Sequence, residues 1–195
     1  RNVLQLNMGN NSFIDIAQFA GISATDWSWA PLIADFNNDG WRDVYITNGY
    51  RKDVTNLDYL NYYRDSVEQS GTFNSLGPTA INEILQHIPH KKLSNYLYLN
   101  TSRLSFTDAG KQAGMDHPSF SNGAAYADLD LDGDLDLVVN NVDEPAFIYR
   151  NDTEAANWLQ IDVRLPSGNT TGIGTGVDVY SAAGHQYGMV SPCRG

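Results

Sequence analysis

The most restrictive feature of this sequence is a nine-residue acidic segment that occurs twice with the same spacing. Residues 35–43 read DFNNDGWRD, and residues 128–136 read DLDLDGDLD. Carboxylates this close together repel one another strongly at neutral pH, which raises the question of what makes the segment tolerable in a folded chain. The same 93-residue offset aligns further residues: Asn7 with Asn100, Phe13 with Phe106, Asp15 with Asp108, Gly21 with Gly114, and Asn48 with Asn141. The chain therefore contains an internal repeat.

The repeating unit is about fifty residues long, because Asn151 follows Asn100 by 51 residues and a third copy starts at residues 148–152. The expected division is a first repeat at 1–50, an insertion at 51–93, a second repeat at 94–150, and a segment at 151–195 that starts a further repeat and a small β domain. A propeller needs ~4 to 8 blades, and repeat units bury their faces against neighbours. We therefore expect this chain to be a piece of a larger protein.

The spacing of apolar residues predicts strands in the repeats and helices in the insertion. Residues 43–48 and 136–141 place Val44 with Ile46, and Leu137 with Val139, on one face, which is the period-two pattern of a strand. In the insertion, apolar residues recur at spacings of three and four, the first run behind a Thr55 cap and the second between Pro78 and Pro89. The two runs are Leu57, Leu60, Tyr63 and Val67, then Ile81, Ile84, Leu85 and Ile88. The fold class expected is mainly β, with propeller-like blades and a helical insertion.

The acidic segments have the pattern of calcium-binding loops. Oxygen-bearing side chains occupy positions one, three, five and nine, and a glycine at position six permits a sharp turn. Ca²⁺ takes ~6 to 8 oxygen ligands, and position seven of such a loop supplies a backbone carbonyl. The first candidate set is Asp35, Asn37, Asp39, the carbonyl of Trp41, and Asp43; the second is Asp128, Asp130, Asp132, the carbonyl of Asp134, and Asp136. Two Ca²⁺ sites are therefore expected.

These loops differ from those of an EF-hand. An EF-hand has a bidentate Glu at position twelve, whereas Ile46 and Val139 occupy that position here, inside expected strands. Each loop is therefore expected to connect two strands of a hairpin. Asp132→Ala is the single change in the second loop that we expect to be most damaging, because it removes a charged ligand beside the turn. An acidic, solvated turn without metal is the alternative interpretation.

Composition narrows the classes of partner. The formal net charge is -11, and only 12 residues are Lys or Arg, so no nucleic-acid partner is expected. No apolar run approaches the ~18 residues of a membrane helix, so no transmembrane segment is expected. Cys193 is the single cysteine and has no internal disulfide partner. Stability is therefore expected to come from packing or from metal.

Other possible sites are less well supported by the sequence. His87 and His90 flank Pro89 and favour a surface turn over a zinc site. Cys193 is interpreted as a buried or incidental thiol and not as a nucleophile. The insertion tyrosines would either dock the insertion on its host or line a sugar-binding surface; these are Tyr59, Tyr62 and Tyr63.

The two loops and their flanking strands resemble FG-GAP/VCBS-type repeats, which form calcium-binding β-propeller blades. Residues 157–195, which contain NWL and GIGTGVDVY, resemble the ASPIC/UnbV domain of cartilage acidic protein-like and Bacteroidetes-type surface proteins. That family commonly has an Asn-Arg pair before the glycine-rich segment, where this chain has Asn169-Thr170-Thr171. The resemblance implies an extracellular or cell-surface location, associated with the outer membrane if the source is bacterial.

Three functional classes follow from these observations. The first is a non-catalytic, calcium-stabilised interaction module with a protein or glycan partner at the cell surface. The second is a subunit of an outer-membrane uptake or assembly complex. The third is a glycan-active enzyme that uses two carboxylates ~5 to 10 Å apart. The third is disfavoured because the metal loops already account for most clustered carboxylates, so no catalytic residue is assigned.

Overall fold

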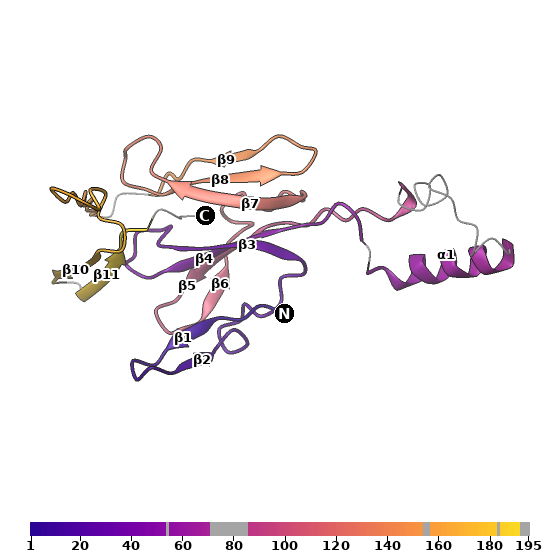
Figure 1. The fold of residues 1–195 in the computed structure, drawn as a ribbon, viewed down its shortest axis with the longest axis horizontal. Coiled ribbons are helices and arrows are strands. Elements are labelled where there is room, and N and C mark those ends of the chain that lie inside the picture. Colours follow the sequence, from indigo (N-terminus) through magenta and orange to yellow (C-terminus); the bar gives the residue numbers. More distant parts are fainter. Residues whose placement is uncertain (54, 71–85, 154–156, 183, 192–195) are drawn as a thin grey trace.

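The computed structural model describes the chain except at residues 54, 71–85, 154–156, 183 and 192–195 (Figure 1). The described strands form four antiparallel sheets, which confirms the expectation of a mainly β protein. The small sheets are β1 (Gln5–Asn7) with β2 (Phe13–Asp15), and β10 (Gly176–Ser181) with β11 (Gly184–Met189). The larger sheets are β3 (Ser28–Ala34), β4 (Asp43–Asn48), β5 (Tyr96–Asn100) and β6 (Phe106–Asp108), and β7 (Ser121–Ala127), β8 (Asp136–Asn141) and β9 (Phe147–Tyr149). No closed propeller forms within these residues.

Three of the sheets stack in layers, with the four-stranded sheet in the middle (Figure 1). One hydrophobic core joins this sheet to the β7–β8–β9 sheet and includes Leu32, Tyr45 and Val139. A second core joins its other face to the segment that follows β2 and includes Ile22 and Val44. Side chains of β4 contribute to both cores, because successive residues of a strand point to opposite faces of the sheet. Both acidic loops lie in hairpins of these packed layers.

The boundaries of the sheets do not coincide with the boundaries of the sequence repeats. The four-stranded sheet takes β3 and β4 from residues 1–50 and takes β5 and β6 from residues 94–150. The insertion lies between β4 and β5, so it leaves the sheet and returns to it. In the repeat alignment β5 and β6 correspond to β1 and β2, which form a sheet of their own. The division into domains drawn from the sequence stays a prediction, and one sheet crosses its boundaries.

The insertion contains helix α1 (Leu57–Ser70), which projects away from the stacked sheets (Figure 1). The helix begins behind Asn56, whose Oδ1 accepts a hydrogen bond from Tyr59 N at 2.9 Å, so the expected Thr55 cap was wrong. Leu57 and Leu60 are 70% and 44% exposed, so the expected apolar face is open at these two residues, whereas Tyr63 is half-buried. Most of the second expected helical run, residues 81–85, lies outside the described residues.

Candidate metal centre

Both acidic loops connect neighbouring antiparallel strands. The first joins β3 to β4 and the second joins β7 to β8, with Ala34 opposite Asp43 and Ala127 opposite Asp136. The glycines at position six have positive φ values, 89° at Gly40 and 98° at Gly133. Residues with a Cβ are strained in this left-handed region, so glycine makes the turn possible. The sharp turns expected at these two glycines are present.

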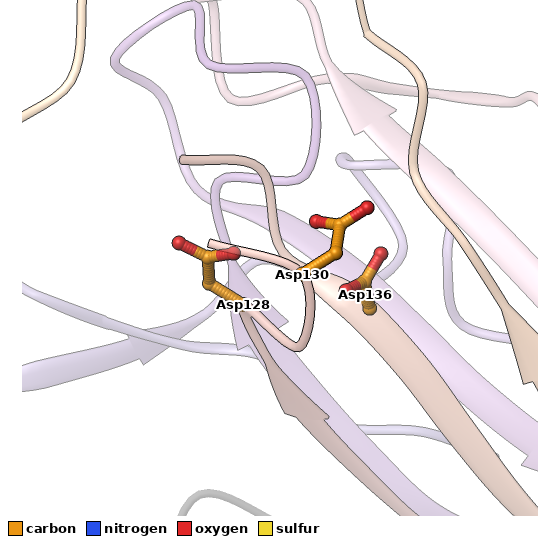
Figure 2. Close-up of side chains that lie close together, drawn as sticks. All are labelled: Asp128, Asp130 and Asp136. Atoms are coloured by element: carbon orange, nitrogen blue, oxygen red, sulfur yellow. The ribbon is translucent and has the colours of Figure 1, made fainter. Parts of the chain in front are cut away.

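The second loop brings three carboxylates together (Figure 2). Oxygens of Asp128, Asp130 and Asp136 all lie within 4.8 Å of one another. Asp128 Oδ2 accepts a hydrogen bond from Gly133 N at 3.1 Å, whereas its Oδ1 is buried and has no hydrogen-bond partner. Loss of water raises the pKa of Asp130, and the charges of Asp132 and Asp136 raise it further. A buried, unpartnered oxygen among like charges fits a bound cation.

The other two aspartates of the second loop direct their side chains to different partners. Asp132 Oδ1 accepts a hydrogen bond from Asp134 N at 2.9 Å, within the turn. Asp134 is buried, and its Oδ1 accepts from Asn38 Nδ2 at 2.6 Å, across to the first loop. Desolvation raises the pKa of Asp134. The assignment of Asp132 and of the Asp134 carbonyl as ligands stays a prediction.

The first loop is held by hydrogen bonds among its own residues. Asp35 accepts from Asp39 N at 3.1 Å and from Gly40 N at 2.8 Å. Asn37 Nδ2 donates to Asp39 Oδ2 at 3.1 Å, and Asp39 Oδ1 accepts from Trp41 N at 2.8 Å. Burial raises the pKa of Asp35. Within the described part of the chain, only the second loop forms a group of three carboxylates, so the first-loop ligand set stays a prediction.

The aspartate at position nine closes each loop through the backbone. Asp43 is 0% exposed, and its Oδ2 accepts from Phe36 N at 2.9 Å while its Oδ1 accepts from Asn100 N at 2.9 Å. Burial raises the pKa of Asp43 to about 6, although both hydrogen bonds oppose this shift. Asp43 therefore ties the start of its loop to the end of β5, a role that the metal-ligand interpretation missed.

Asp136 has the same arrangement in the second loop. It is 2% exposed, its Oδ2 accepts from Leu129 N at 2.8 Å, and its Oδ1 accepts from Asn151 N at 2.9 Å. The sequence carried a signal for this role. Asn100 and Asn151 occupy equivalent positions of the repeat, and their backbone N–H groups donate to the equivalent aspartates Asp43 and Asp136. Because a carboxylate oxygen has two lone pairs, this use of Asp136 is compatible with a cation in the Asp128 and Asp130 cluster.

The two loops are in contact with each other. Asn151 Nδ2 donates to Phe36 O at 2.7 Å and to Leu135 O at 3.3 Å, so a single amide joins the first loop to the second. The bond between Asn38 and Asp134 is a further link. Sequence reasoning found neither contact, because both join residues that the repeat pattern places in separate copies. The two loops therefore lie against each other.

The C-terminal segment packs against both loops. A Cβ built on Gly133 would lie 2.1 Å from Nε1 of Trp158, so the indole covers the glycine turn of the second loop. Arg42 Nη2 donates to Tyr187 O in β11 at 2.8 Å, beside the first loop. The small C-terminal hairpin β10–β11 therefore lies next to the loops, as Figure 1 shows.

The remaining candidates show no site of their own in the described residues. His90 contacts the Arg51 carbonyl and Phe120, and no histidine belongs to the carboxylate group. Cys193 lies outside the described residues. Tyr59 and Tyr63 stack with ring centroids 6.5 Å apart on α1. None of the described helices has the length and apolar character needed to cross a membrane.

A family model described as FG-GAP-like repeat matches residues 1–46, which include the whole first loop. This match confirms the FG-GAP part of the resemblance. Repeats of this kind are typically non-catalytic interaction modules, often bind Ca²⁺, and are usually extracellular or surface-exposed. A search of curated proteins found no match to the chain.

Proposed function

We propose that this chain is a non-catalytic, calcium-stabilised interaction module that works outside the cytoplasm. The observation that carries the proposal is the group of Asp128, Asp130 and Asp136, together with the buried and unpartnered Oδ1 of Asp128. The FG-GAP-like match at residues 1–46 supports the same class of protein. In this proposal the ions neutralise the loops and hold the hairpins, and a protein or glycan partner binds elsewhere.

Calcium is the cation that this donor set fits best. The group offers oxygen ligands only, which hard cations prefer, and it contains neither the nitrogen nor the sulfur ligands typical of zinc sites. Mg²⁺ demands a near-ideal octahedron and keeps several waters, whereas Ca²⁺ accepts irregular sets of carboxylates and carbonyls. We assign the stronger site to the second loop, because Asn37 replaces a carboxylate in the first.

The wider setting of the module is part of the proposal. The stacked sheets would be propeller blades, and residues 157–195 with β10–β11 would begin an ASPIC/UnbV-like domain of a Bacteroidetes-type surface protein. The exposed face of α1 is the surface we assign to the partner, because it projects from the stacked sheets. An outer-membrane complex and a glycan-active enzyme stay the alternatives, and no described contact favours either.

Calorimetric titration of the metal-free chain with Ca²⁺ and with Mg²⁺ tests the proposal. We expect saturable Ca²⁺ binding that Asp128→Ala and Asp130→Ala each weaken at least tenfold. Asp162→Ala is the matched control, because Asp162 is exposed, pairs with Arg164 and belongs to neither loop. Absence of Ca²⁺ binding, or equal effects in all three variants, would contradict the proposal. Glycan turnover abolished by one substitution outside the loops would overturn its non-catalytic part.

A further inference from the structure

The first loop carries an exposed tryptophan that its calcium-loop pattern does not explain. At position seven that pattern uses only the backbone carbonyl, yet the Trp41 side chain is large and the residue is 50% exposed. Its equivalent in the second loop, Asp134, is buried and accepts a hydrogen bond from Asn38. The next position differs as well, because Arg42 stands where the second loop has Leu135. The two copies therefore differ at side chains that belong to neither predicted ligand set.

Trp41 and Arg42 line a groove of about 970 Å³ between the first loop and the C-terminal hairpin. Residues 185–189 of β11 form its other side, and β1 and the end of β3 also line it. Ligand sites in proteins typically enclose ~300 to 1,000 Å³. The groove therefore has the size of a binding site.

The two sides of the groove are in contact with each other. Arg42 Nη2 donates to Tyr187 O at 2.8 Å. A Cβ built on Gly40 would lie 3.0 Å from Nε2 of Gln186, so that side-chain amide lies against the turn of the first loop. The groove is therefore formed jointly by the first loop and by β11.

Exposed apolar side chains from several elements gather along this groove. They come from β3, from the first loop, from the turn between β5 and β6, and from β11, and each is between 41% and 55% exposed: Ile33, Trp41, Leu104, Tyr187 and Met189. Exposed apolar residues that are grouped together and rimmed by polar ones mark binding surfaces. Two of the five are aromatic, and they stand on opposite sides of the groove.

The charges and polar groups of the groove favour an uncharged, hydroxyl-rich ligand. Among the described residues that line it, Asp35 and Arg42 are the two with a formal charge at neutral pH, and these charges cancel. The net charge of -11 on the whole chain disfavours acidic ligands. The Arg42 guanidinium has five N–H donors, of which one bonds to the Tyr187 carbonyl. The side-chain amides of Gln5 and Gln186 add further donors and acceptors.

We propose that this groove binds an uncharged oligosaccharide. Trp41 and Tyr187 would contact the apolar C–H faces of the sugar rings, and Arg42 and Gln186 would bond to their hydroxyl groups. Sugars of β-linked gluco configuration fit best, because their equatorial substituents leave both ring faces apolar. The inference rests on the proposed function, since it names a glycan as a partner of the module and gives it a site. The β10–β11 hairpin lies at the opposite end of the stacked sheets from α1, so the helix stays available to a second partner (Figure 1).

Calorimetric titration of the full chain in Ca²⁺ with cellohexaose and with chitohexaose tests this inference. We expect saturable binding of at least one of these sugars, weakened at least about tenfold by Trp41→Ala and by Tyr187→Ala. Tyr187→Phe keeps the aromatic ring and should weaken binding less than about threefold. Trp29→Ala is the matched control, because Trp29 is 53% exposed and does not line the groove. It should leave the affinity for the sugar unchanged.

Absence of saturable binding of both sugars would overturn the proposal. Equal affinities in the unaltered chain, Trp41→Ala and Tyr187→Ala would also overturn it, as would an equal loss in Trp29→Ala. Trp41→Ala should bind Ca²⁺ as the unaltered chain does, because the predicted ligand at this position is a carbonyl. If it does not, Tyr187→Ala decides the outcome, because Tyr187 lies outside both loops. Sugar binding without Ca²⁺ binding would uphold the groove and overturn the calcium proposal, and Ca²⁺ binding without sugar binding would do the reverse.

Discussion

Asp136→Ala is expected to destabilise the protein more than Asp132→Ala, which reverses the ranking that the loop pattern alone suggests. Asp136 is 2% exposed and accepts from Leu129 N at 2.8 Å and from Asn151 N at 2.9 Å. Truncation leaves two backbone donors without an acceptor, at roughly 1 to 3 kcal/mol each. Relief of the desolvated carboxylate offsets part of this loss. The net expected cost is about 3 kcal/mol.

Asp132→Ala is expected to lower the free energy of unfolding much less than Asp136→Ala in the absence of metal. Its side chain is exposed, and its hydrogen bond from Asp134 N can be replaced by water. The expected cost is about 0.5 to 1 kcal/mol. The difference between the two variants, about 2 kcal/mol, corresponds to a difference in Tm of roughly 4 to 8 °C for a chain of this size. Asp136→Asn retains one acceptor and should lie between them.

Urea unfolding in chelator, followed by tryptophan fluorescence, measures this difference without any contribution from bound ions. Repeating the titrations in Ca²⁺ adds the ligand-linked stability of each variant. If Asp132→Ala costs as much as Asp136→Ala in chelator, the assignment of position nine to backbone closure is wrong. Asp136 would then have no structural role beyond that of Asp132 in the metal-free protein.

Three further predictions concern other parts of the chain. Gly133→Ala should destabilise the protein by more than about 1 kcal/mol, because φ is 98° and the new Cβ meets the Trp158 indole. In urea titrations, adding Trp158→Ala should restore only part of this loss, because it removes the contact and leaves the backbone strain. Burial raises the pKa of Asp43 from 3.8 to about 6. Because the folded state then binds the proton more tightly than the unfolded state, the free energy of unfolding in chelator includes this contribution in full below about pH 4 and loses it as the pH rises through about 6. Unfolding measured across this range should show that fall, and Ca²⁺ should reduce it by favouring the ionised form. Leu60→Glu on α1 should change Tm by less than about 1 °C, because Leu60 is 44% exposed.

The sequence predicts the local features of the loops because they depend on local chemistry. The turns at Gly40 and Gly133 follow from a glycine at position six, and both have the expected positive φ. The strands on either side follow from the alternation of apolar residues. The helix of the insertion follows from spacings of three and four, although its cap is Asn56 and not Thr55. Each of these properties is decided by residues that are close together in the chain.

The contacts between repeats could not be predicted in the same way. Asp134 is acidic and lies at position seven, so its sequence environment suggests solvent or metal, yet its side chain is buried against Asn38 of the other loop. Asn151 belongs to the third copy and still bonds to Phe36 in the first loop. Such contacts depend on how the sheets stack, and a repeat pattern specifies each unit without specifying the distance between units.

The hydrogen bonds of Asp43 and Asp136 show that the two halves of each loop have different roles. The front half, from position one to position five, carries half-buried and exposed carboxylates that a cation would gather. The back half ends in a buried carboxylate whose two oxygens already hold the loop start and the neighbouring strand. Because these carboxylates accept hydrogen bonds from backbone donors of the protein itself, we expect the hairpin to be ordered before an ion binds, so that binding meets a partly preorganised site. We therefore expect Ca²⁺ to add stability to a sheet that already forms in chelator, in contrast to small metal domains that are unfolded without their ion.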